Sequence, residues 1–519
     1  MNRHASRRTL LLACLLVLVA VVAVMRPWSE PEATTLAPTY VTKRSPVLDA
    51  FMAQVVAASK IDDPLERCLR MPDPPGSHWH RDAVDAYCRT RNAELMDNAR
   101  FRALIAAGKG DEVDHVFEGY LQKQMHDPQF AMHVDQAVAR AGFRKANSET
   151  RAAIDAWKKQ RPNSAFAVAA SGMQYDDAAF DARGAAFASK TSEAQWQAAQ
   201  DLAGLARREL DRAAAMQPVI PSIYSHMFSV GVLTDDHRYA MQALERGLEV
   251  QPNNVGLRMT EAHFTGEKWG GSTAWVARQA DEAAAAAIRT NTPLLWVAAG
   301  RARIHAATQG FMAPPADGGF VAAASEVAAA SDLDSLADQA NRSGTRDEAF
   351  VLAVEALRFD SELEDSLGII GHLATKGYYP DWARAQLVRA AHDHPDSAGV
   401  AGTAGVWLRY LGEPGIAEPL MVYATEHGKD DWVLARLGDF YTHEGHDYAK
   451  AHVISEELIR RNPRNGDGYV IRACIERDTN DPHRFMSAKD FVERFGSDPY
   501  QQGPVAEMRA WLAAHPEPT

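Results

Sequence analysis

Basic runs are missing from most of this sequence. Its 55 lysines and arginines are outnumbered by 68 aspartates and glutamates, which gives a formal net charge of −13, and no basic stretch of useful length follows Arg26. A general nucleic-acid binder needs a basic face that neutralises phosphate. We therefore expect no nucleic-acid partner.

Catalytic signatures are missing too. The sequence contains no G-x-S-x-G elbow, S-x-x-K string, phosphate-binding loop or G-x-G-x-x-G fingerprint. The string His443-Glu444-Gly445-His446 has its histidines three apart, whereas H-E-x-x-H needs them four apart to share one helix face. We expect no catalytic residue, no cofactor and no metal site, although an enzyme whose site is scattered over several helices would lack such motifs as well.

Strand patterns are lacking, because no run shows the alternating β-branched residues that a sheet needs. Apolar residues recur instead at helical spacing, for example over 82–96, 112–125, 239–250 and 505–514. The chain of 519 residues is too long for one ordinary core. The sequence therefore predicts an all-α protein with more than one lobe.

Long apolar runs are confined to the N-terminus. Leu10–Met25 is uninterrupted and follows three arginines. Its length is slightly below the ~20 residues that span ~30 Å of hydrocarbon, and no convincing A-x-A cleavage site accompanies it. We predict an uncleaved anchor in a bacterial inner membrane, with everything after Trp28 in the periplasm; a cleaved signal peptide is the alternative.

Cysteines are few. Cys14 lies in the apolar run and Cys474 has no obvious partner, whereas Cys68 and Cys88 are 20 residues apart around a proline-rich loop. In an exported protein this pair is expected to form a disulfide. Two buried free thiols are the alternative.

A period of 34 residues is what the sequence does have. Ala349, Ala383, Ala417 and Ala451 each open a helical pattern with mainly apolar or small residues at +3, +4, +7 and +8, and a turn follows at +12. Ala206 and Ala240 form an earlier pair at the same spacing. Helix and turn repeating every 34 residues indicate an α-solenoid of the tetratricopeptide type.

The repeats and the breaks between them suggest six segments. These are a signal anchor or signal peptide (1–28), a proline-rich linker (29–46), an irregular helical cap (47–146), a first repeat lobe (147–309), a junction (310–344) and a second lobe with a C-terminal capping helix (345–519).

Two resemblances accompany these patterns. Leu437-Gly438, Tyr441, Ala451 and Pro463 resemble tetratricopeptide and Sel1-like repeats over about 206–477; this implies a helical-repeat fold that holds peptides or partner helices. Residues from about 104 to 272, ending in a W-G-G-S string, resemble a bacterial helical family of unknown function. That second resemblance implies a helical-repeat fold and no established activity.

The W-G-G-S string is the most unusual local feature, formed by Trp269, Gly270, Gly271 and Ser272. One interpretation is a ligand-contacting loop with an indole platform. The favoured interpretation is structural: a Gly-Gly turn, with Ser272 or Thr273 capping the next helix and Trp269 covering the junction between repeats.

Together these features favour a non-catalytic scaffold that binds a protein or peptide partner in the cell envelope. The membrane would be reached through Leu10–Met25. An envelope enzyme, perhaps a hydrolase with its site in the N-terminal lobe, and a purely structural spacer are the alternatives.

Overall fold

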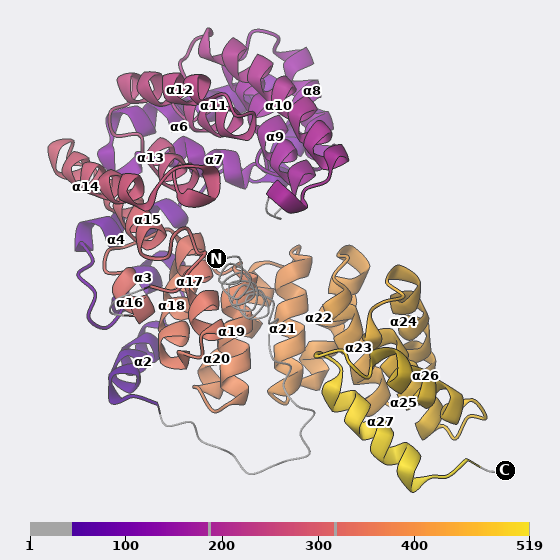
Figure 1. Cartoon of the computed structure of the whole chain (residues 1–519). Coiled ribbons are helices and arrows are strands. Elements are labelled where there is room, and N and C mark those ends of the chain that lie inside the picture. Colours follow the sequence, from indigo (N-terminus) through magenta and orange to yellow (C-terminus); the bar gives the residue numbers. More distant parts are fainter. Residues whose placement is uncertain (1–43, 185–187, 316–318, 518–519) are drawn as a thin grey trace, which may run out of the picture. The chain divides into compact units, whose positions relative to one another are not determined.

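The computed structural model describes residues 44–184, 188–315 and 319–517, and within these ranges every regular element is a helix (Figure 1). The predicted all-α fold is therefore confirmed. The helices form two compact units: residues 45–340 with 347–361, and residues 341–346 with the chain from 362 onward.

The predicted N-terminal anchor, with its apolar run Leu10–Met25, lies outside the described residues. Among the helices that are described, none combines the length and the hydropathy needed to cross a bilayer.

The described residues of the first unit form seventeen α-helices and three short 3₁₀ helices. In chain order these are α2 (Pro46–Ala58), α3 (Pro64–Arg70), α4 (Arg81–Arg91), α5 (Asn98–Ala106), α6 (Gly110–His126), η1 (Pro128–Phe130), α7 (His133–Arg140), α8 (Ser148–Gln160), α9 (Ala165–Arg183), η2 (Ala188–Lys190), α10 (Glu193–Ala214), α11 (Ile223–Leu233), α12 (His237–Val250), α13 (Val255–Phe264), η3 (Glu267–Trp269), α14 (Thr273–Arg289), α15 (Leu295–Ala307), α16 (Gly319–Ala323), α17 (Ala330–Arg342) and α18 (Arg346–Phe359).

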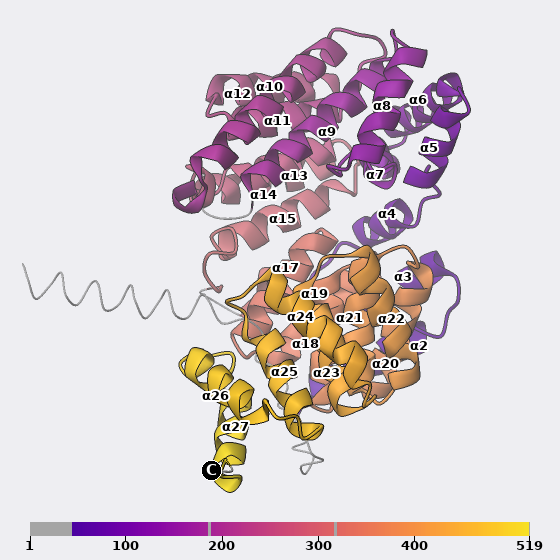
Figure 2. The ribbon, with the colours of Figure 1, turned by 90° about the vertical axis from the view of Figure 1, so that its right-hand side faces the viewer.

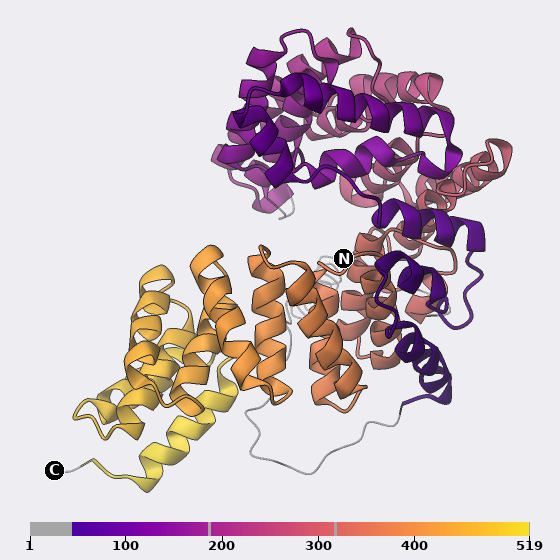
Figure 3. The same ribbon diagram turned by 180° about the vertical axis from the view of Figure 1, so that it is seen from behind.

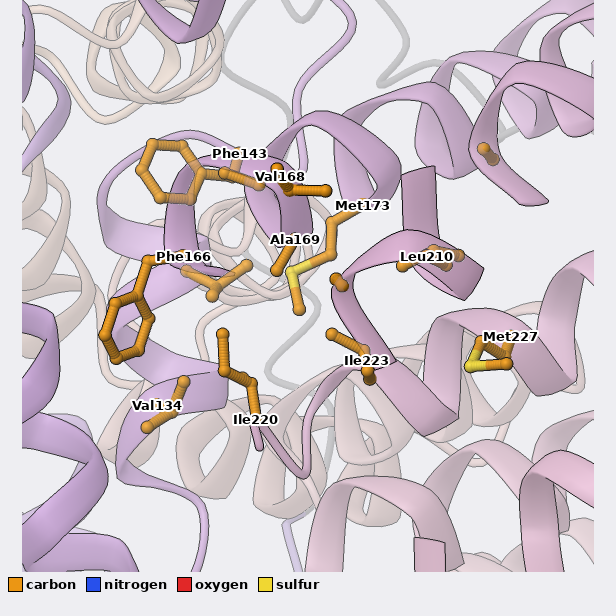
Figure 4. Close-up of a cluster of buried hydrophobic side chains, with 14 of the residues drawn as sticks. Val134, Phe143, Phe166, Val168, Ala169, Met173, Leu210, Ile220, Ile223 and Met227 are labelled. Atoms are coloured by element: carbon orange, nitrogen blue, oxygen red, sulfur yellow. The ribbon is translucent and has the colours of Figure 1, made fainter. Parts of the chain in front are cut away.

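Helix α9 is the centre of the first unit. Its first half, residues 165–173, is apolar or small on every side, so it can be stable only when neighbours surround it. Helix α9 contacts α6, α8, α10 and α11 (Figure 2). A Cβ on Gly172 would lie 2.7 Å from the Leu210 side chain, so this glycine lets α10 approach closely. Figure 4 shows the side chains of this core converging from α7, α9, α10 and α11.

The predicted helical cap (47–146) is not separate from the first lobe. One hydrophobic core runs from Met96 through Phe117 and Phe166 to Leu257. The cap and lobe share this core because Phe117 packs against Phe143, Trp157 and Phe166. This core continues across the boundary expected near residue 146.

The Cys68–Cys88 disulfide is present and joins α3 to α4, with a Cα–Cα distance of 5.8 Å. Arg358 of α18 donates from Nε to the Cys68 carbonyl oxygen (2.9 Å) and pairs with Glu355 at 3.1 Å, and both of these side chains are fully buried. Burial raises the pKa of Glu355 to about 7. Helix α18 is thus fastened to the first unit, although Ala349 continues the alanine series of the second.

As far as residue 517, where the description ends, the second unit has nine helices: α19 (Glu364–Thr375), α20 (Pro380–Asp393), α21 (Ala398–Tyr410), α22 (Pro414–His427), α23 (Asp431–His443), α24 (Tyr448–Arg461), α25 (Gly466–Asp478), α26 (Arg484–Phe495) and α27 (Gln502–Ala514). Each odd-numbered helix from α19 to α23 contacts both the next helix and the next odd-numbered one. Figure 3 shows these helices standing side by side. Each repeat thus has a first helix (α19, α21, α23) and a second helix (α20, α22, α24), and the first helices of successive repeats stand in a row. This is the arrangement of an α-solenoid, as the 34-residue period predicts.

Ion pairs between consecutive repeats fix the register of this array. Arg409 of α21 has a side chain only 4% exposed and pairs with Asp439 of α23 at 2.8 Å, while its Nη1 donates to the Arg436 carbonyl oxygen (3.0 Å). One repeat is thereby joined to the next through a charged group that is almost entirely withdrawn from water.

The C-terminal helix closes the array as the sequence predicts. Val505 and Met508 of α27 are buried against Phe491, Phe495 and the first helix of the last repeat. Cys474 lies in this core, and burial raises the pKa of its thiol to about 12, so it behaves as a small apolar side chain.

Candidate functional sites

The W-G-G-S string forms a tight turn between α13 and α14. Gly270 adopts a left-handed conformation (φ 85°), and a Cβ on Gly271 would lie 1.8 Å from the Thr265 carbonyl oxygen. Ser272 then caps α14, since its Oγ accepts from the Trp275 N–H at 3.2 Å. These contacts agree with the structural interpretation, in which glycine is required by close approach and serine by the helix N-terminus.

Trp269 itself is half-buried at the centre of a ring cluster. Its ring centroid lies 4.9 Å from Phe264, 6.2 Å from Phe180 and 6.3 Å from His263. The rings come from α9, α13 and η3, so the indole covers the junction of these elements.

Two cationic side chains lie over the same indole. The Arg183 guanidinium carbon is 5.2 Å from the Trp269 ring centroid and 5.4 Å from that of Trp196, and the Lys268 Nζ is 5.8 Å from that of Trp269. Burial and then the charge of Arg183 lower the pKa of Lys268. The indole of the W-G-G-S string, its platform, is thus flanked by two cations.

A histidine–aspartate group adjoins the platform. His305 of α15 is 4% exposed; its Nε2 lies 3.4 Å from Asp332 Oδ1, and Arg301 Nη2 lies at the same distance from that oxygen. The His263 ring is 5.6 Å from the His305 ring. Burial, followed by the charge of Arg301, lowers the pKa of His263 to about 3 and keeps it neutral, and its Nδ1 has no hydrogen-bond partner.

A second buried polar cluster lies on α7, α9 and α11. Asp176 Oδ2 accepts from Ser229 Oγ (2.5 Å) and lies 2.8 Å from His226 Nδ1. Burial raises the pKa of Asp135, and it raises that of Asp177 to about 6 against the opposing charges of His226 and Arg144. This cluster can hold protons near neutral pH, but within the described chain no three His, Cys, Asp or Glu side chains are placed to bind a metal ion.

A row of rings crosses the first helices of the second unit. His372 of α19, Trp407 of α21 and Trp432 of α23 lie in sequence, with centroid distances of 5.5 and 6.4 Å. Trp407 is buried, whereas Trp432 is 38% exposed at the N-terminal end of its helix. The row runs across three repeats.

Carboxylates gather at that same end of the helices. Glu364 of α19 lies against the first turn of α21, where a Cβ on Gly399 would be 1.8 Å from its Oε1. Burial and then the charges of Asp430 and Asp365 raise the pKa of Glu364. Asp430 caps α23 by accepting from the Trp432 N–H at 2.8 Å. We refer to Glu364, Asp365, Asp430, Trp407 and Trp432 as the acidic–aromatic patch.

Sequence reasoning found some of these residues and missed others. It singled out Trp269 and its turn, and it paired Cys68 with Cys88. It missed His263, His305 and Asp332, because they lie on three helices and no fixed spacing links them. It also missed Trp432, whose ring contact with Trp407 depends on how one repeat stacks on the next.

Comparison with known proteins gives one family match. A family model described as a domain of unknown function (DUF4034) matches residues 97–232, about a quarter of the chain. The expected likeness to a family of unknown function is therefore confirmed over that segment, whereas the W-G-G-S string lies beyond it. No curated protein shows significant similarity.

Two solved structures resemble the chain at low sequence identity. The crystal structure of the yeast Tom70 aligns with a TM-score of 0.32 and 11% identity, covering 80% of this chain and 94% of that one. The APC/C hetero-tetramer Cut9–Hcn1 aligns with a TM-score of 0.33 and 10% identity, covering 89% and 87%.

Proposed function

We propose that the protein is a non-catalytic scaffold whose second unit binds a peptide segment carrying lysine or arginine. The observation that carries this proposal is the acidic–aromatic patch, in which an exposed tryptophan and three carboxylates from two repeats meet at one end of the first helices. Helical-repeat arrays commonly use an extended face of this kind to bind partners.

The negative charge around the acidic–aromatic patch favours a basic peptide as its ligand. Residues 362–431 contain eleven Asp or Glu and five Lys or Arg, so this stretch attracts cations more strongly than anions. Burial and then the charges of Asp430 and Asp365 raise the pKa of Glu364, and a cation placed between these carboxylates relieves their repulsion. Trp432 offers a face for a lysine or arginine side chain.

The cell envelope is the proposed setting. The arginines and apolar run at the N-terminus support a tether in the inner membrane with both units in the periplasm. The disulfide supports an oxidising compartment, because such bonds persist in the periplasm and are rare in the cytosol.

A peptide array tests the proposal. The purified protein is probed against random twelve-residue peptides, and we expect the bound peptides to be enriched in lysine and arginine. A charge-reversing variant, Asp430→Lys, should abolish that enrichment, whereas Asp381→Lys on the exposed end of α20 should preserve it. Peptides bound without any basic preference would contradict the proposal.

A further inference from the structure

We propose that a cluster of aspartates in the first unit binds the ammonium group of a small organic amine. The aspartate cluster is formed by Asp135 of α7, Asp176 and Asp177 of α9, and His226 of α11. It lies in the first unit, so it is separate from the acidic–aromatic patch and does not depend on the peptide-binding function.

The first argument is the balance of charge. His226 Nδ1 lies 2.8 Å from Asp176 Oδ2 and 4.0 Å from Asp177 Oδ2. The charge of His226 also acts on Asp135. Arg144 adds a second positive group, with its Nε 3.7 Å from Asp177 Oδ1 and a side chain that is mostly exposed. Three carboxylates thus share one imidazole and one exposed guanidinium, and a further cation is attracted to them.

The second argument is unused hydrogen-bonding capacity on buried atoms. Asp176 is 3% exposed, and its Oδ2 accepts from Ser229, but its Oδ1 has no hydrogen-bond partner. Oδ2 of Asp135 and Oδ2 of Asp177 also have none. The Ser222 hydroxyl, on a side chain 2% exposed, lies beside Asp135 yet makes no hydrogen bond of normal geometry. Orphaned buried polar atoms are uncommon in folded proteins, so three carboxylate oxygens without donors indicate a ligand that carries donors.

Protonation of the aspartate cluster supports the same conclusion. Burial raises the pKa of Asp177 to about 6, against the opposing charges of His226 and Arg144, and burial also raises the pKa of Asp135. The raised values mean that an ionised carboxylate is poorly stabilised at this place. A bound ammonium group supplies that stabilisation, so an amine that binds near pH 6 displaces a proton from Asp177 into solvent.

Geometry favours an ammonium group over a metal ion. A metal ion needs its oxygen ligands at about 2.0–2.6 Å, and within the described ranges no three His, Cys, Asp or Glu side chains are placed to hold one. An ammonium group carries three donors that reach carboxylates at about 2.7–2.9 Å, so it tolerates a wider arrangement. The side chains of Asp177 and His226 are partly exposed, which lets a ligand reach the aspartate cluster from solvent.

Isothermal titration calorimetry with butylamine tests the proposal. Tetramethylammonium is the control for charge without N–H donors, and butanol is the uncharged control. We expect butylamine to bind at least tenfold more tightly than either control, and to bind more tightly at pH 7.5 than at pH 5, where Asp177 is protonated. At pH 6, titrations in buffers of different ionisation enthalpy should detect the release of a proton.

Variants locate the site. Asp177→Asn removes one charge at a partly exposed position, and it should weaken butylamine binding at least tenfold and abolish proton release at pH 6. Asp181→Asn, at an exposed position of the same helix, is the matched control and should stay within threefold of the parent protein. Asp430→Lys, in the acidic–aromatic patch, should bind butylamine as the parent does.

Three results would overturn the proposal. One is equal butylamine binding by Asp177→Asn and Asp181→Asn, and another is tetramethylammonium binding as tightly as butylamine. The third is loss of butylamine binding in Asp430→Lys, because the amine would then occupy the second unit. If Asp177→Asn fails to fold, the parent protein decides the matter alone: butylamine that does not bind, or that binds at pH 6 without releasing a proton, contradicts the site.

Discussion

The indole of Trp407 on α21 lies 6.4 Å from that of Trp432 on α23, so a buried ring in one repeat supports an exposed ring in the next. This contact ties the surface of the second unit to its packing. Trp432 is held in position by a neighbour that cannot move without disturbing two helices. A pre-positioned aromatic side chain beside carboxylates is suited to anchor a basic peptide, because little side-chain entropy is lost on binding.

Arg409→Ala should destabilise the second unit by about 3 kcal/mol. The substitution removes an almost fully buried guanidinium that pairs with both Asp439 and Glu444, and breaking ion pairs of a buried group is costly. Chemical denaturation followed by fluorescence measures the effect. Arg460→Ala is the matched control, because Arg460 is an exposed partner of Glu457 on α24 and its loss should change stability little. Equal effects at the two sites would contradict the buried inter-repeat pair.

Gly271→Ala should destabilise the first unit by about 2 kcal/mol or more, since the new methyl group would overlap the Thr265 carbonyl oxygen and force the turn before α14 to shift. Thermal unfolding checks this. A Cβ on Gly266 of the same loop would meet nothing within 4 Å, so Gly266→Ala should have a far smaller effect. A tolerated Gly271→Ala would show that the turn is looser than described.

Replacing both Cys68 and Cys88 by alanine should lower the stability of the first unit by about 3 kcal/mol, the expected value for closing a loop of this size. Reducing the parent protein with dithiothreitol should give the same loss. Cys474→Ala, at the buried free thiol, keeps the disulfide and should lose as much stability on reduction as the parent protein, whereas the double alanine variant should be indifferent to the reductant. A parent protein that is indifferent to reduction would argue against the bond.

His263→Gln should change how stability depends on pH. The native-state pKa of His263 is about 3, whereas an unfolded histidine titrates near 6.5, so the unfolded state takes up the proton first as the pH falls. The parent protein therefore loses up to about 1.4 kcal/mol from this group for each unit below pH 6.5. The variant has no histidine at this position and so does not lose this stability. The difference in free energy of unfolding between parent and variant should therefore shrink steadily from pH 6.5 to pH 4. A difference that is constant with pH would contradict a buried neutral His263.

The helices and their period were predictable from the sequence because they depend on local rules. The alanine series predicted the positions of α20, α22 and α24, and the W-G-G-S string predicted a cap at Ser272 or Thr273, of which the structure uses Ser272. The disulfide was expected from the spacing of the two cysteines and from the predicted export of the chain. Each of these depends on residues that are close in sequence or chemically constrained to pair.

The boundary between the two units and the buried polar clusters could not be predicted, because they depend on residues that are far apart in sequence. The pattern that begins at Ala349 predicts which face of α18 is apolar, but it does not predict which helix packs against that face. In the structure, Arg358 attaches α18 to Cys68, which is 290 residues away in sequence. Likewise, His305 and Asp332 are 27 residues apart on different helices. Only tertiary packing brings such groups together.

The most direct test of the peptide-binding account is photocrosslinking in cells from a benzoylphenylalanine placed at position 432. Position 416 is the control, because Ile416 has a similar exposure (41%, against 38% for Trp432) but lies on a second helix of the array. The account predicts crosslinks from position 432 to one or a few envelope proteins through lysine- or arginine-rich segments, and their loss when Asp430 is changed to lysine. Crosslinks that are absent from position 432, or that are the same from both positions, would contradict it.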